Sequence, residues 1–468
     1  MKSPRLKTGL CAALMAFSLP LGLMAQRAAS TVKPDAVGSD PSWKPGDPPP
    51  ASWIDPATGH RVVRVSQEPN SASFYFNVNA YTPDGKQMVY TSPEGVYALD
   101  LTTWKSRQVV KGHVFAIQAG FKTPSVFYIK AEGEEAESAT PAARASMKRS
   151  LYVTNIDTGE TRKLVDLPPR AMVSTINADE TLAAGTYIEG NAGEGQPYTT
   201  PSQSRPESER RGGQQPQGLL QPLNKGQMME QRLAARLPIV LFVIDLRTGQ
   251  MRTLLHSTDW VNHLLFSPTD PDLLMYCHEG PWQKVDRIWT IHTDGTHNTM
   301  IHKRTMFMEI FGHEFWGHDG HTLWYDWQTP KGEDFWLASY NVDTGRRAAY
   351  HMQRNEWSIH FNVSHDESLF CGDGGDPGQV AHAPDGEWIY LFHPRMITGE
   401  GINKPDFIQP GVFHAERLVN MSRHNYRLEP NVSFTPDMKW IIFRSNMFGP
   451  TYVFAVEVAK AAPGNGQQ

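Results

Sequence analysis

The chain has 468 residues, with 44 Lys and Arg against 49 Asp and Glu, and a formal net charge of −5. A composition with 38 Gly, 35 Pro and 40% hydrophobic residues excludes collagen-like, coiled-coil and wholly disordered chains. The slight acidity argues against nucleic acid as a partner, whereas 13 Trp, 15 Tyr, 21 Phe and 18 His favour stacking surfaces and imidazole chemistry.

The amino terminus has the pattern of a secretory signal peptide over residues 1–25. Three basic residues within the first seven precede an apolar run from residue 9 to residue 24, and Ala25 is the expected cleavage point. No later stretch reaches the roughly 18 apolar residues that a membrane helix needs. We therefore expect an exported, periplasmic or secreted protein without a membrane span.

Only two cysteines remain after the signal peptide, Cys277 and Cys371. They either pair in an oxidising compartment or stay as buried thiols. Residues 26–50, rich in Pro, Gly, Ser and Asp, predict a flexible leader, and residues 461–468 predict a flexible tail.

One pattern recurs through residues 51–460. A short strand leads into a Pro-Asp-Gly-like turn and a second strand; a third strand then ends in an Asp-x-x-Gly-like turn before a fourth. The first of these turns recurs about every 40–50 residues outside insertions, which is the repeat length of four-stranded propeller blades. Its seven occurrences lie near residues 83–85, 120–124, 178–180, 267–270, 318–320, 364–366 and 435–437.

The repeat predicts one all-β domain, a seven-bladed β-propeller. Because the edges of a blade need neighbours to cover them, the ring must close. We expect residues 60–66 to pair with residues 451–458 and join the two ends. Residues 192–236 interrupt the repeat and predict a flexible loop followed by a short helix, which is either a plain surface loop or a lid over the central channel.

Four polar residues occupy equivalent places in four blades. His263, His313, His360 and Asn431 each lie five residues before one position of the first turn of their blade, namely residues 268, 318, 365 and 436. Since the innermost strands of a propeller line its centre, equal offsets place these side chains at one height. Any one histidine alone is more often structural, but three imidazoles and an amide together could hold Mn, Zn, Fe or Ni.

A charged group lies close to one of these histidines along the chain. It comprises Glu279, Lys284, Asp286 and Arg287. Such a group is either a solvated ion-pair surface or a site for an anionic substrate.

Several segments of the chain resemble the oligogalacturonate lyases. They are residues 260–287, His313-Glu314-Phe315-Trp316, residues 360–374 and Ser433-Phe434-Thr435-Pro436-Asp437. The resemblance covers most of the chain from about Ile239 onward, and His278-Glu279-Gly280-Pro281 followed by the His313 motif is its most specific part. It implies a seven-bladed propeller that cleaves short pectin fragments by β-elimination with a manganese-type ion.

The resemblance also implies roles for single residues. His313 matches a metal ligand, and His263, which follows Trp260, matches the general base. The family's Gln-x-x-His-x-His run aligns with Tyr426, Glu429 and Asn431, so the implied metal ligands are His313, Glu429 and Asn431, with His424 nearby.

The cations and the remaining histidines complete the predicted site. The family's catalytic arginine is expected near Val240, where this chain has none, and Arg236 is the nearest candidate. Lys284 and Arg287 are expected to bind the substrate carboxylate, and His278 and His360 to line the substrate site.

The sequence thus predicts a lyase that cleaves short oligogalacturonides, with Mn²⁺ as its cofactor and an acidic oligosaccharide as its partner. Two alternatives stay open at this point. One is a lyase acting on another uronate-containing oligosaccharide, and the other is a non-catalytic periplasmic binding propeller.

Overall fold

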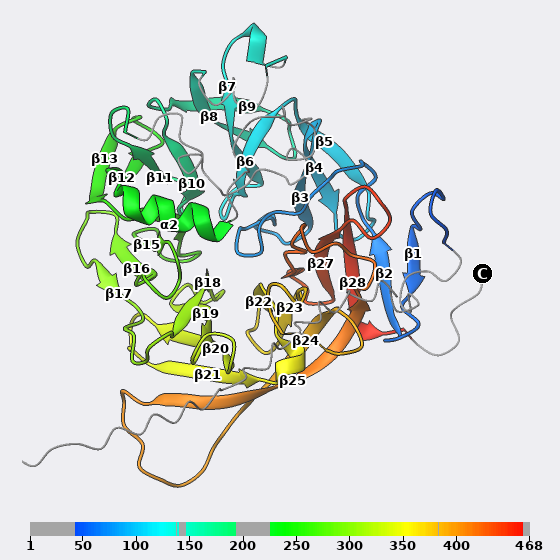
Figure 1. Cartoon of the computed structure of the whole chain (residues 1–468). Helices are drawn as coiled ribbons and strands as arrows, with labels where there is room; N and C mark the ends of the chain where they lie inside the picture. The colour runs from blue at the N-terminus through cyan, green and yellow to red at the C-terminus, as the bar shows by residue number, and fades with distance from the viewer. Residues whose placement is uncertain (1–42, 137, 140–146, 193–224, 382, 462–468) are drawn as a thin grey trace, which may run out of the picture. The chain divides into compact units, whose positions relative to one another are not determined.

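The computed structural model describes residues 43–461 except 137, 140–146, 193–224 and 382. The expected signal peptide, most of the expected leader and insertion, and the tail from residue 462 onward lie outside the described residues. Within the unit Val37–Gln468, the described elements are almost all β-strands, arranged as small sheets around a ring (Figure 1). The predicted all-β class is confirmed.

Seven blades follow one another along the described chain, each built from antiparallel strands. Blade 1 contains β3 (Gln87–Ser92), β4 (Gly95–Asp100) and β5 (Ser106–Lys111), and blade 2 contains β6 (Val114–Ala119), β7 (Ser125–Ala131), β8 (Arg149–Asn155) and β9 (Thr161–Asp166). Blade 3 contains β10 (Met172–Ile176), β11 (Leu182–Ile188), β12 (Ile239–Asp245) and β13 (Met251–Ser257), and blade 4 contains β14 (Trp260–Phe266), β15 (Leu273–Glu279), β16 (Ile288–His292) and β17 (Thr299–Met300).

The remaining blades complete the ring. Blade 5 contains β18 (Ile310–Trp316), β19 (Thr322–Gln328), β20 (Phe335–Asn341) and β21 (Arg347–Met352), and blade 6 contains β22 (Phe361–Val363), β23 (Phe370–Gly372), β24 (Trp388–Met396) and β25 (Ile408–Asn420). Blade 7 contains β26 (Ser433–Phe434), β27 (Trp440–Ser445) and β28 (Tyr452–Lys460), with β2 (His60–Arg64) and β1 (Ser52–Ile54) from the other end of the chain.

Blade 7 closes the ring by combining both ends of the described chain. β2 runs antiparallel to β28, with Val62 opposite Val456 and Val63 opposite Ala455. Val62 and Val456 are fully buried, so the closing pair is part of the core. The predicted pairing of residues 60–66 with residues 451–458 is confirmed.

The hydrophobic core is divided among the contacts between blades. Seven clusters of buried side chains each join two consecutive blades of the described chain. The cluster of Met88, Tyr90, Ile442 and Val453, for example, joins blade 1 to blade 7. Seven interfaces around a closed ring confirm the predicted seven-bladed propeller.

The predicted turns fall between the first and second strands of blades 2 to 7, and the predicted turn of blade 1 directly precedes β3. In several of them an aspartate accepts a backbone N–H two residues later, as Asp319 does from His321 at 2.9 Å and Asp366 does from Ser368 at 3.0 Å. These turns share one face of the ring. The segments that enter the innermost strands therefore lie on the opposite face, together with the helix α2 (Lys225–Ala235), which connects β11 to β12.

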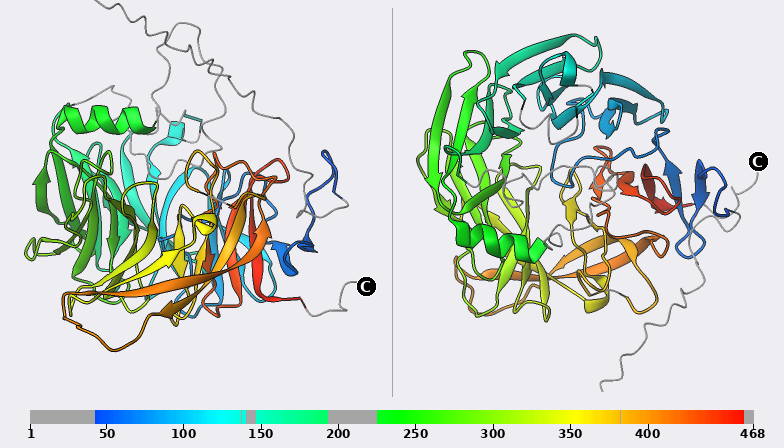
Figure 2. Two further views of the ribbon diagram at one scale, coloured as in Figure 1. Left: turned by 60° about the horizontal axis from the view of Figure 1, so that its bottom comes forward. Right: turned by 45° about the horizontal axis from the view of Figure 1, so that its top comes forward.

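Two further features shape the ring. Blades 5 and 6 form a single eight-stranded sheet, because β21 and β25 pair in parallel from Arg347↔Ile408 to His351↔Val412. Figure 2 shows α2 over one face and the loop that joins β24 to β25 at the other.

Short 3-10 helices occupy Glu134–Ala136 and Arg354–Glu356. No helix among the described residues is long and apolar enough to cross a membrane.

Candidate active site

Three histidines and one asparagine lie on, or directly before, the innermost strands of four blades, as their equal offsets predict. His263 belongs to β14 and His313 to β18, while His360 precedes β22 and Asn431 precedes β26. The rings of His313 and His360 lie 4.8 Å apart, centre to centre. The ring of Tyr75 lies 5.1 Å from His360 and 6.2 Å from His263, so it links the two sides of this group.

Backbone irregularities direct these side chains toward the centre. The pairing of β14 with β15 shifts between Asn262 and Leu265, and that of β18 with β19 shifts between Gly312 and Phe315. His263 and His313 lie within these bulges with left-handed φ angles of 50° and 44°. Left-handed backbone is costly for residues other than glycine, and bulges that redirect a side chain are enriched beside active sites.

His263 and Glu279 form a hydrogen-bonded dyad. His263 Nε2 lies 2.8 Å from Glu279 Oε2, so we assign the ring proton to Nε2, where it is donated to the carboxylate. His263 Nδ1 is buried and has no hydrogen-bond partner among the described residues. An imidazole oriented by a carboxylate, with its other nitrogen unpaired, is arranged to accept a proton.

Arg287 is fully buried between two glutamates rather than open to a ligand. Its guanidinium lies 3.2 Å from Glu279 Oε1 and 3.4 Å from Glu314, and it lies over the ring of Trp282 at 4.5 Å. Burial opposes ionisation of Glu279, but Arg287 and His263 outweigh it and hold the pKa of Glu279 well below its usual range. The sequence predicted that Arg287 binds a substrate carboxylate. In the structure Arg287 instead pairs with the two glutamates in a buried ion-pair network.

Two carboxylates orient the other two histidines. His313 Nδ1 lies 3.3 Å from Asp326, and His360 Nδ1 lies 2.8 Å from Asp373. A carboxylate on one ring nitrogen fixes the tautomer and leaves the other nitrogen available, which is the usual arrangement of metal-binding histidines. Burial lowers the pKa of His313, which keeps its imidazole neutral and able to donate a lone pair.

Glu429 adds a carboxylate to this group. Its Oε2 lies 3.8 Å from His360 Nε2. Burial opposes ionisation of Glu429, but the charges of His360, Lys225 and His313 outweigh it and lower the pKa of Glu429 to about 2. Two imidazoles and one carboxylate form a donor set that fits Mn²⁺, Fe²⁺ or Zn²⁺. In the structure His360 Nε2 contacts the Tyr75 hydroxyl at 3.1 Å, a contact that coordination by His360 would replace.

Two of the predicted metal ligands, His424 and Asn431, are engaged in hydrogen bonds within the protein. His424 Nε2 donates to the Leu428 carbonyl at 2.6 Å, and His424 Nδ1 accepts from the Ser445 hydroxyl at 2.9 Å. The Asn431 amide accepts the N–H of Phe76 at 3.2 Å and donates to the Glu429 carbonyl at 2.9 Å. The structure thus gives both residues a positioning role, and Asn431 holds the backbone of Glu429 in place.

Three of the predicted substrate contacts lie at the edge of the site. Arg236 pairs with Asp259, and Asp259 also lies 3.1 Å from His278 Nδ1. Lys284 pairs with Glu230 of α2 at 2.8 Å. The Arg236–Asp259 and Lys284–Glu230 pairs connect α2 and the residue after it to blade 4. Arg236, His278 and Lys284 are therefore already paired with carboxylates of the protein.

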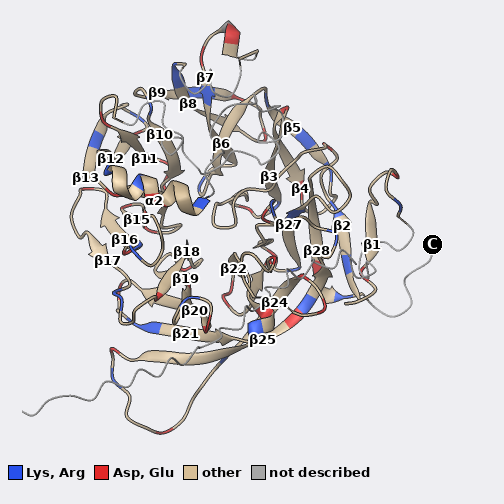
Figure 3. Cartoon of the chain, in the orientation of Figure 1, with Lys and Arg blue, Asp and Glu red and all other residues tan. Residues whose placement is uncertain are grey.

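Two further cations whose charge acts on the site come from one face of α2, which the sequence analysis missed. Arg232 is 6% exposed and lies 3.9 Å over the ring of Trp260. Burial lowers the pKa of Arg232 to about 9, and its charge acts on Glu279. The charge of Lys225 acts on Glu279, His313 and Glu429. Lys225 is the first residue of α2, whose end near the centre of the ring is basic in Figure 3.

Helical spacing could have identified these cations. Lys225, Met229 and Arg232 follow i, i+4, i+7 spacing and so share one helix face. Arg236 lies beyond the helix end with a left-handed φ of 46°, which removes it from that face.

A segment before blade 1 supplies the Tyr75 ring, which the repeat pattern did not reveal. Side chains from two other blades bind its backbone, and one of its own side chains binds the backbone of β18. Asn362 donates to the Phe76 carbonyl at 3.0 Å, Asn431 accepts from the Phe76 N–H, and Asn77 donates to the Glu314 carbonyl at 2.9 Å. This segment thereby fixes Tyr75 between the histidines.

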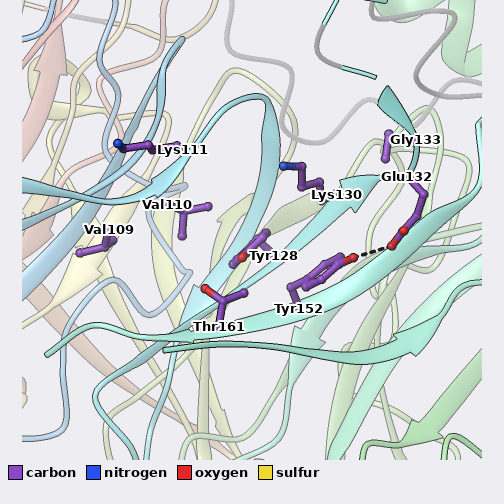
Figure 4. Close-up of a pocket in the computed structure, with 10 residues that line it drawn as sticks. Val109, Val110, Lys111, Tyr128, Lys130, Glu132, Gly133, Tyr152 and Thr161 are labelled. Carbon is purple, nitrogen blue, oxygen red and sulfur yellow. Dashed lines mark hydrogen bonds between the residues drawn. The ribbon is translucent and has the colours of Figure 1, made fainter. Parts of the chain in front are cut away.

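A separate cavity of about 450 Å³ lies at the contact between blades 1 and 2 (Figure 4). Lys111 of β5 and Lys130 of β7 line it, together with Tyr128 and Tyr152. The Tyr152 hydroxyl donates to Glu132 at its edge. The cavity contains none of the aligned histidines, so the candidate active site is the group at the centre of the ring.

The cysteines are both buried and free. The alternative in which Cys277 and Cys371 remain thiols is therefore the one that the structure supports.

Comparison with known proteins places the fold and this group of residues in one family. The family model described as oligogalacturonate lyase matches residues 220–462, which is more than half of the chain. The chain belongs to the oligogalacturonate lyase family. The match includes β14, β18, β22 and β26, the strands that carry or follow the four aligned polar residues.

Individual members of the family agree with this assignment. An oligogalacturonide lyase of Pectobacterium atrosepticum is 23% identical over 424 residues, and an oligogalacturonate lyase of Dickeya dadantii is 24% identical over 425 residues. In both cases the alignment covers 87% of this chain and 95% of the relative.

Two solved structures share the fold. An oligogalacturonate lyase in complex with manganese aligns with a TM-score of 0.62 at 22% identity, covering 87% of this chain and 96% of the other. An oligogalacturonate lyase from Vibrio parahaemolyticus aligns with a TM-score of 0.64 at 20% identity over the same shares.

The environment of His424 gives a testable dependence of stability on pH. Burial lowers the pKa of His424 to about 4 from 6.5, so between these values the unfolded chain binds more protons than the folded chain. Stability is therefore fully present above pH 6.5 and falls by about 3 kcal/mol as the pH drops toward 4. We expect His424→Gln to flatten this dependence in urea unfolding measured from pH 7 to pH 4.

The matched control is His256→Gln, since the His256 side chain is 65% exposed. It should leave the pH dependence unchanged. If His424→Gln instead removed a bound metal ion and left the acid profile steep, His424 would be a ligand after all.

Proposed function

We propose that this protein cleaves short oligogalacturonides by β-elimination, releasing 4,5-unsaturated uronate products with the help of Mn²⁺. The observation that carries the proposal is the arrangement at the centre of the ring. The His263–Glu279 dyad faces a group of two imidazoles and a carboxylate, His313, His360 and Glu429, in a chain of the oligogalacturonate lyase family.

In this mechanism His263 is the general base. Its unpaired Nδ1 takes the C5 proton of the uronate, and the electron pair left on carbon forms the C4–C5 double bond as O4 leaves. The imidazolium that forms is stabilised by Glu279, whose lowered pKa keeps it anionic at neutral pH. Arg287 holds Glu279 in place through its other oxygen.

The uronate carboxylate must be neutralised before the C5 proton becomes acidic enough to remove. A bound divalent cation supplies positive charge that stabilises the anion developing beside the carboxylate. Arg232 and Lys225 of α2 add positive charge on the same side of the ring. We therefore place the catalytic cation of α2 at Arg232 rather than Arg236.

The metal is proposed to be manganese, held by His313, Glu429 and His360. The relative solved with manganese supports the choice of ion, and the nitrogen and oxygen donors of this chain suit it. The ligand set differs from the family's run, because Tyr426 donates its hydroxyl to the Asp373 carbonyl and Asn431 bonds to backbone.

The altered ligand run supports one second candidate, a lyase acting on another uronate-containing oligosaccharide. Glu429 replaces a neutral imidazole with a carboxylate, so the ion would carry less net charge toward the substrate. Digalacturonate and a glucuronate-containing disaccharide, assayed side by side, separate the two substrates. A non-catalytic binding propeller has no need for a histidine–carboxylate dyad.

We expect His263→Ala to lower kcat by at least about 100-fold with digalacturonate and Mn²⁺, because a positioned general base contributes about 10²–10⁴-fold. The rise in ultraviolet absorbance of the unsaturated product measures the rate. His256→Ala, an exposed histidine, is the control and should keep the wild-type rate. Full activity of His263→Ala would remove the base assignment.

His313→Ala and Glu429→Gln should each weaken Mn²⁺ binding by at least about tenfold, since each removes a donor at an ion that needs them. Equilibrium dialysis with Mn²⁺ measures this directly, without reference to activity. The exposed His256→Ala is the control and should bind Mn²⁺ as the wild-type protein does. One bound Mn²⁺ in His313→Ala at wild-type affinity would refute the ligand assignment.

We also propose that the chain is exported to the periplasm or secreted, with residues 1–25 removed. The basic start, the apolar run and Ala25 support this. Expression of the full chain in a Gram-negative host should yield a mature protein beginning at Gln26 outside the cytoplasm, as read by amino-terminal sequencing. An intact amino terminus in the cytoplasmic fraction would contradict export.

A further inference from the structure

Cys277 lies beside the His263–Glu279 dyad, and the proposed chemistry does not use it. Cys277 and Glu279 are two residues apart on β15 and so face the same side of the sheet. The bulge in β14 brings His263 over them. One donor atom from each of the three residues lies within 4.8 Å of the other two, and Cys277 Sγ is 3.9 Å from Glu279 Oε2.

We propose that His263, Cys277 and Glu279 form a second metal site, selective for thiophilic divalent cations such as Zn²⁺, and that its occupation inhibits the enzyme. The site is separate from the group formed by His313, His360 and Glu429. The inhibitory effect rests on the proposed function, whereas the binding site itself does not.

The geometry is close to what a tetrahedral zinc ion requires. With Zn–N and Zn–O bonds of about 2.0 Å and a Zn–S bond of about 2.3 Å, neighbouring ligand atoms are about 3.3–3.6 Å apart. The present separations of 2.8 Å from His263 to Glu279 and 3.9 Å from Cys277 to Glu279 bracket that value. Glu279 uses only Oε2 for these contacts, so Oε1 can remain on Arg287.

Charge around the site also favours a divalent cation. The charged groups in direct contact are Glu279, Glu314 and Arg287, which sum to −1 when His263 is neutral and Cys277 is a thiol. Arg232 and Lys225, whose charges also act on Glu279, lie outside these contacts. Binding adds two positive charges and releases the thiol proton to solvent, so these contacts become neutral overall.

Cys277 remains a thiol until a metal enters. Burial raises the pKa of the Cys277 thiol well above its ordinary value. Arg287 Nη2 lies 3.6 Å from Sγ and would stabilise the thiolate once the metal displaces the proton. Hard ions such as Mn²⁺ gain little from a thiolate ligand. The site with Cys277 should therefore prefer softer ions such as Zn²⁺, and the site of His313, His360 and Glu429 should prefer Mn²⁺.

Inhibition follows from the tautomer of His263. A metal on Nε2 needs the lone pair there, so the ring proton must move to Nδ1. The Nδ1 lone pair that accepts the C5 proton is then lost. Zinc would therefore switch off the base without displacing manganese.

Cobalt(II) makes the site visible independently of catalysis, because only a thiolate ligand produces the intense near-ultraviolet sulfur-to-cobalt charge-transfer band. We expect this band in the metal-stripped protein at one equivalent of Co²⁺. It should disappear in both Cys277→Ser and Cys277→Ala. Cys371→Ser is the matched control, because Cys371 is equally buried and free but belongs to no such cluster among the described residues.

A band in Cys371→Ser and none in the two Cys277 variants supports the site. Absence of the band in the wild-type protein, or its persistence in both Cys277 variants, overturns the proposal. Wild-type Mn²⁺ binding by either Cys277 variant shows that it is folded. Because two substitutions are used, failure of one to fold still leaves the test decisive.

The inhibitory effect is tested on lyase activity with Mn²⁺ in excess. Wild-type protein should be inhibited by Zn²⁺, and Cys277→Ala should need at least about tenfold more Zn²⁺ for half-inhibition. Equal inhibition of both proteins, relieved by more Mn²⁺, would place zinc at the manganese site and overturn the inhibitory role. If no preparation cleaves digalacturonate, the proposed function fails, while the cobalt band still decides the metal site.

Discussion

The structure depends on closure of a ring whose blades cannot be stable alone. Each blade buries both of its faces against neighbours, and the seven interfaces between blades contain the hydrophobic core of the described chain. The last of these interfaces forms only when β2 pairs with β28, which joins residues almost 400 positions apart. Because His263, His313, His360 and Asn431 come from four blades, their grouping exists only in the closed ring.

A buried ion-pair network connects this closed scaffold to the chemistry. Placing Arg287, Glu279 and Glu314 away from water is costly unless their charges and hydrogen bonds are satisfied by one another. The result is a glutamate that stays anionic and fixed on one side of His263. Stability is thus traded for a preorganised histidine–carboxylate pair, a trade that is common in active sites.

Much of this fold could be predicted because turns and offsets repeat. The aspartate turns mark where the innermost strands end, so the equal spacing of His263, His313 and His360 before them identified the centre of the ring. That spacing reports position only. It could not show that both ring nitrogens of His424 are hydrogen-bonded, one to the Leu428 carbonyl and one to the Ser445 hydroxyl, since those contacts depend on how one turn of blade 7 closes.

Other parts of the site lie outside the repeated pattern, so the sequence repeat could not reveal them. Tyr75 comes from a segment outside the blade pattern, and its place is set by asparagines from distant blades. Arg287 reads as a surface cation in the sequence, but β15 and β18 enclose it between two glutamates. The choice between Arg232 and Arg236 depended on where α2 ends, because Arg236 is the first residue beyond the helix.

The parallel pairing of β21 with β25 makes blades 5 and 6 one continuous sheet. His313 lies on β18 and His360 directly precedes β22, which are the two opposite edge strands of that sheet. Strand pairing therefore joins the two blades at their outer strands, whereas side-chain packing between them, with Phe315 and Phe361 among its members, sets the 4.8 Å gap between the two imidazoles. Among the described residues no strand of blade 4 pairs with blade 5, so the position of His263 relative to His313 depends on side-chain packing alone.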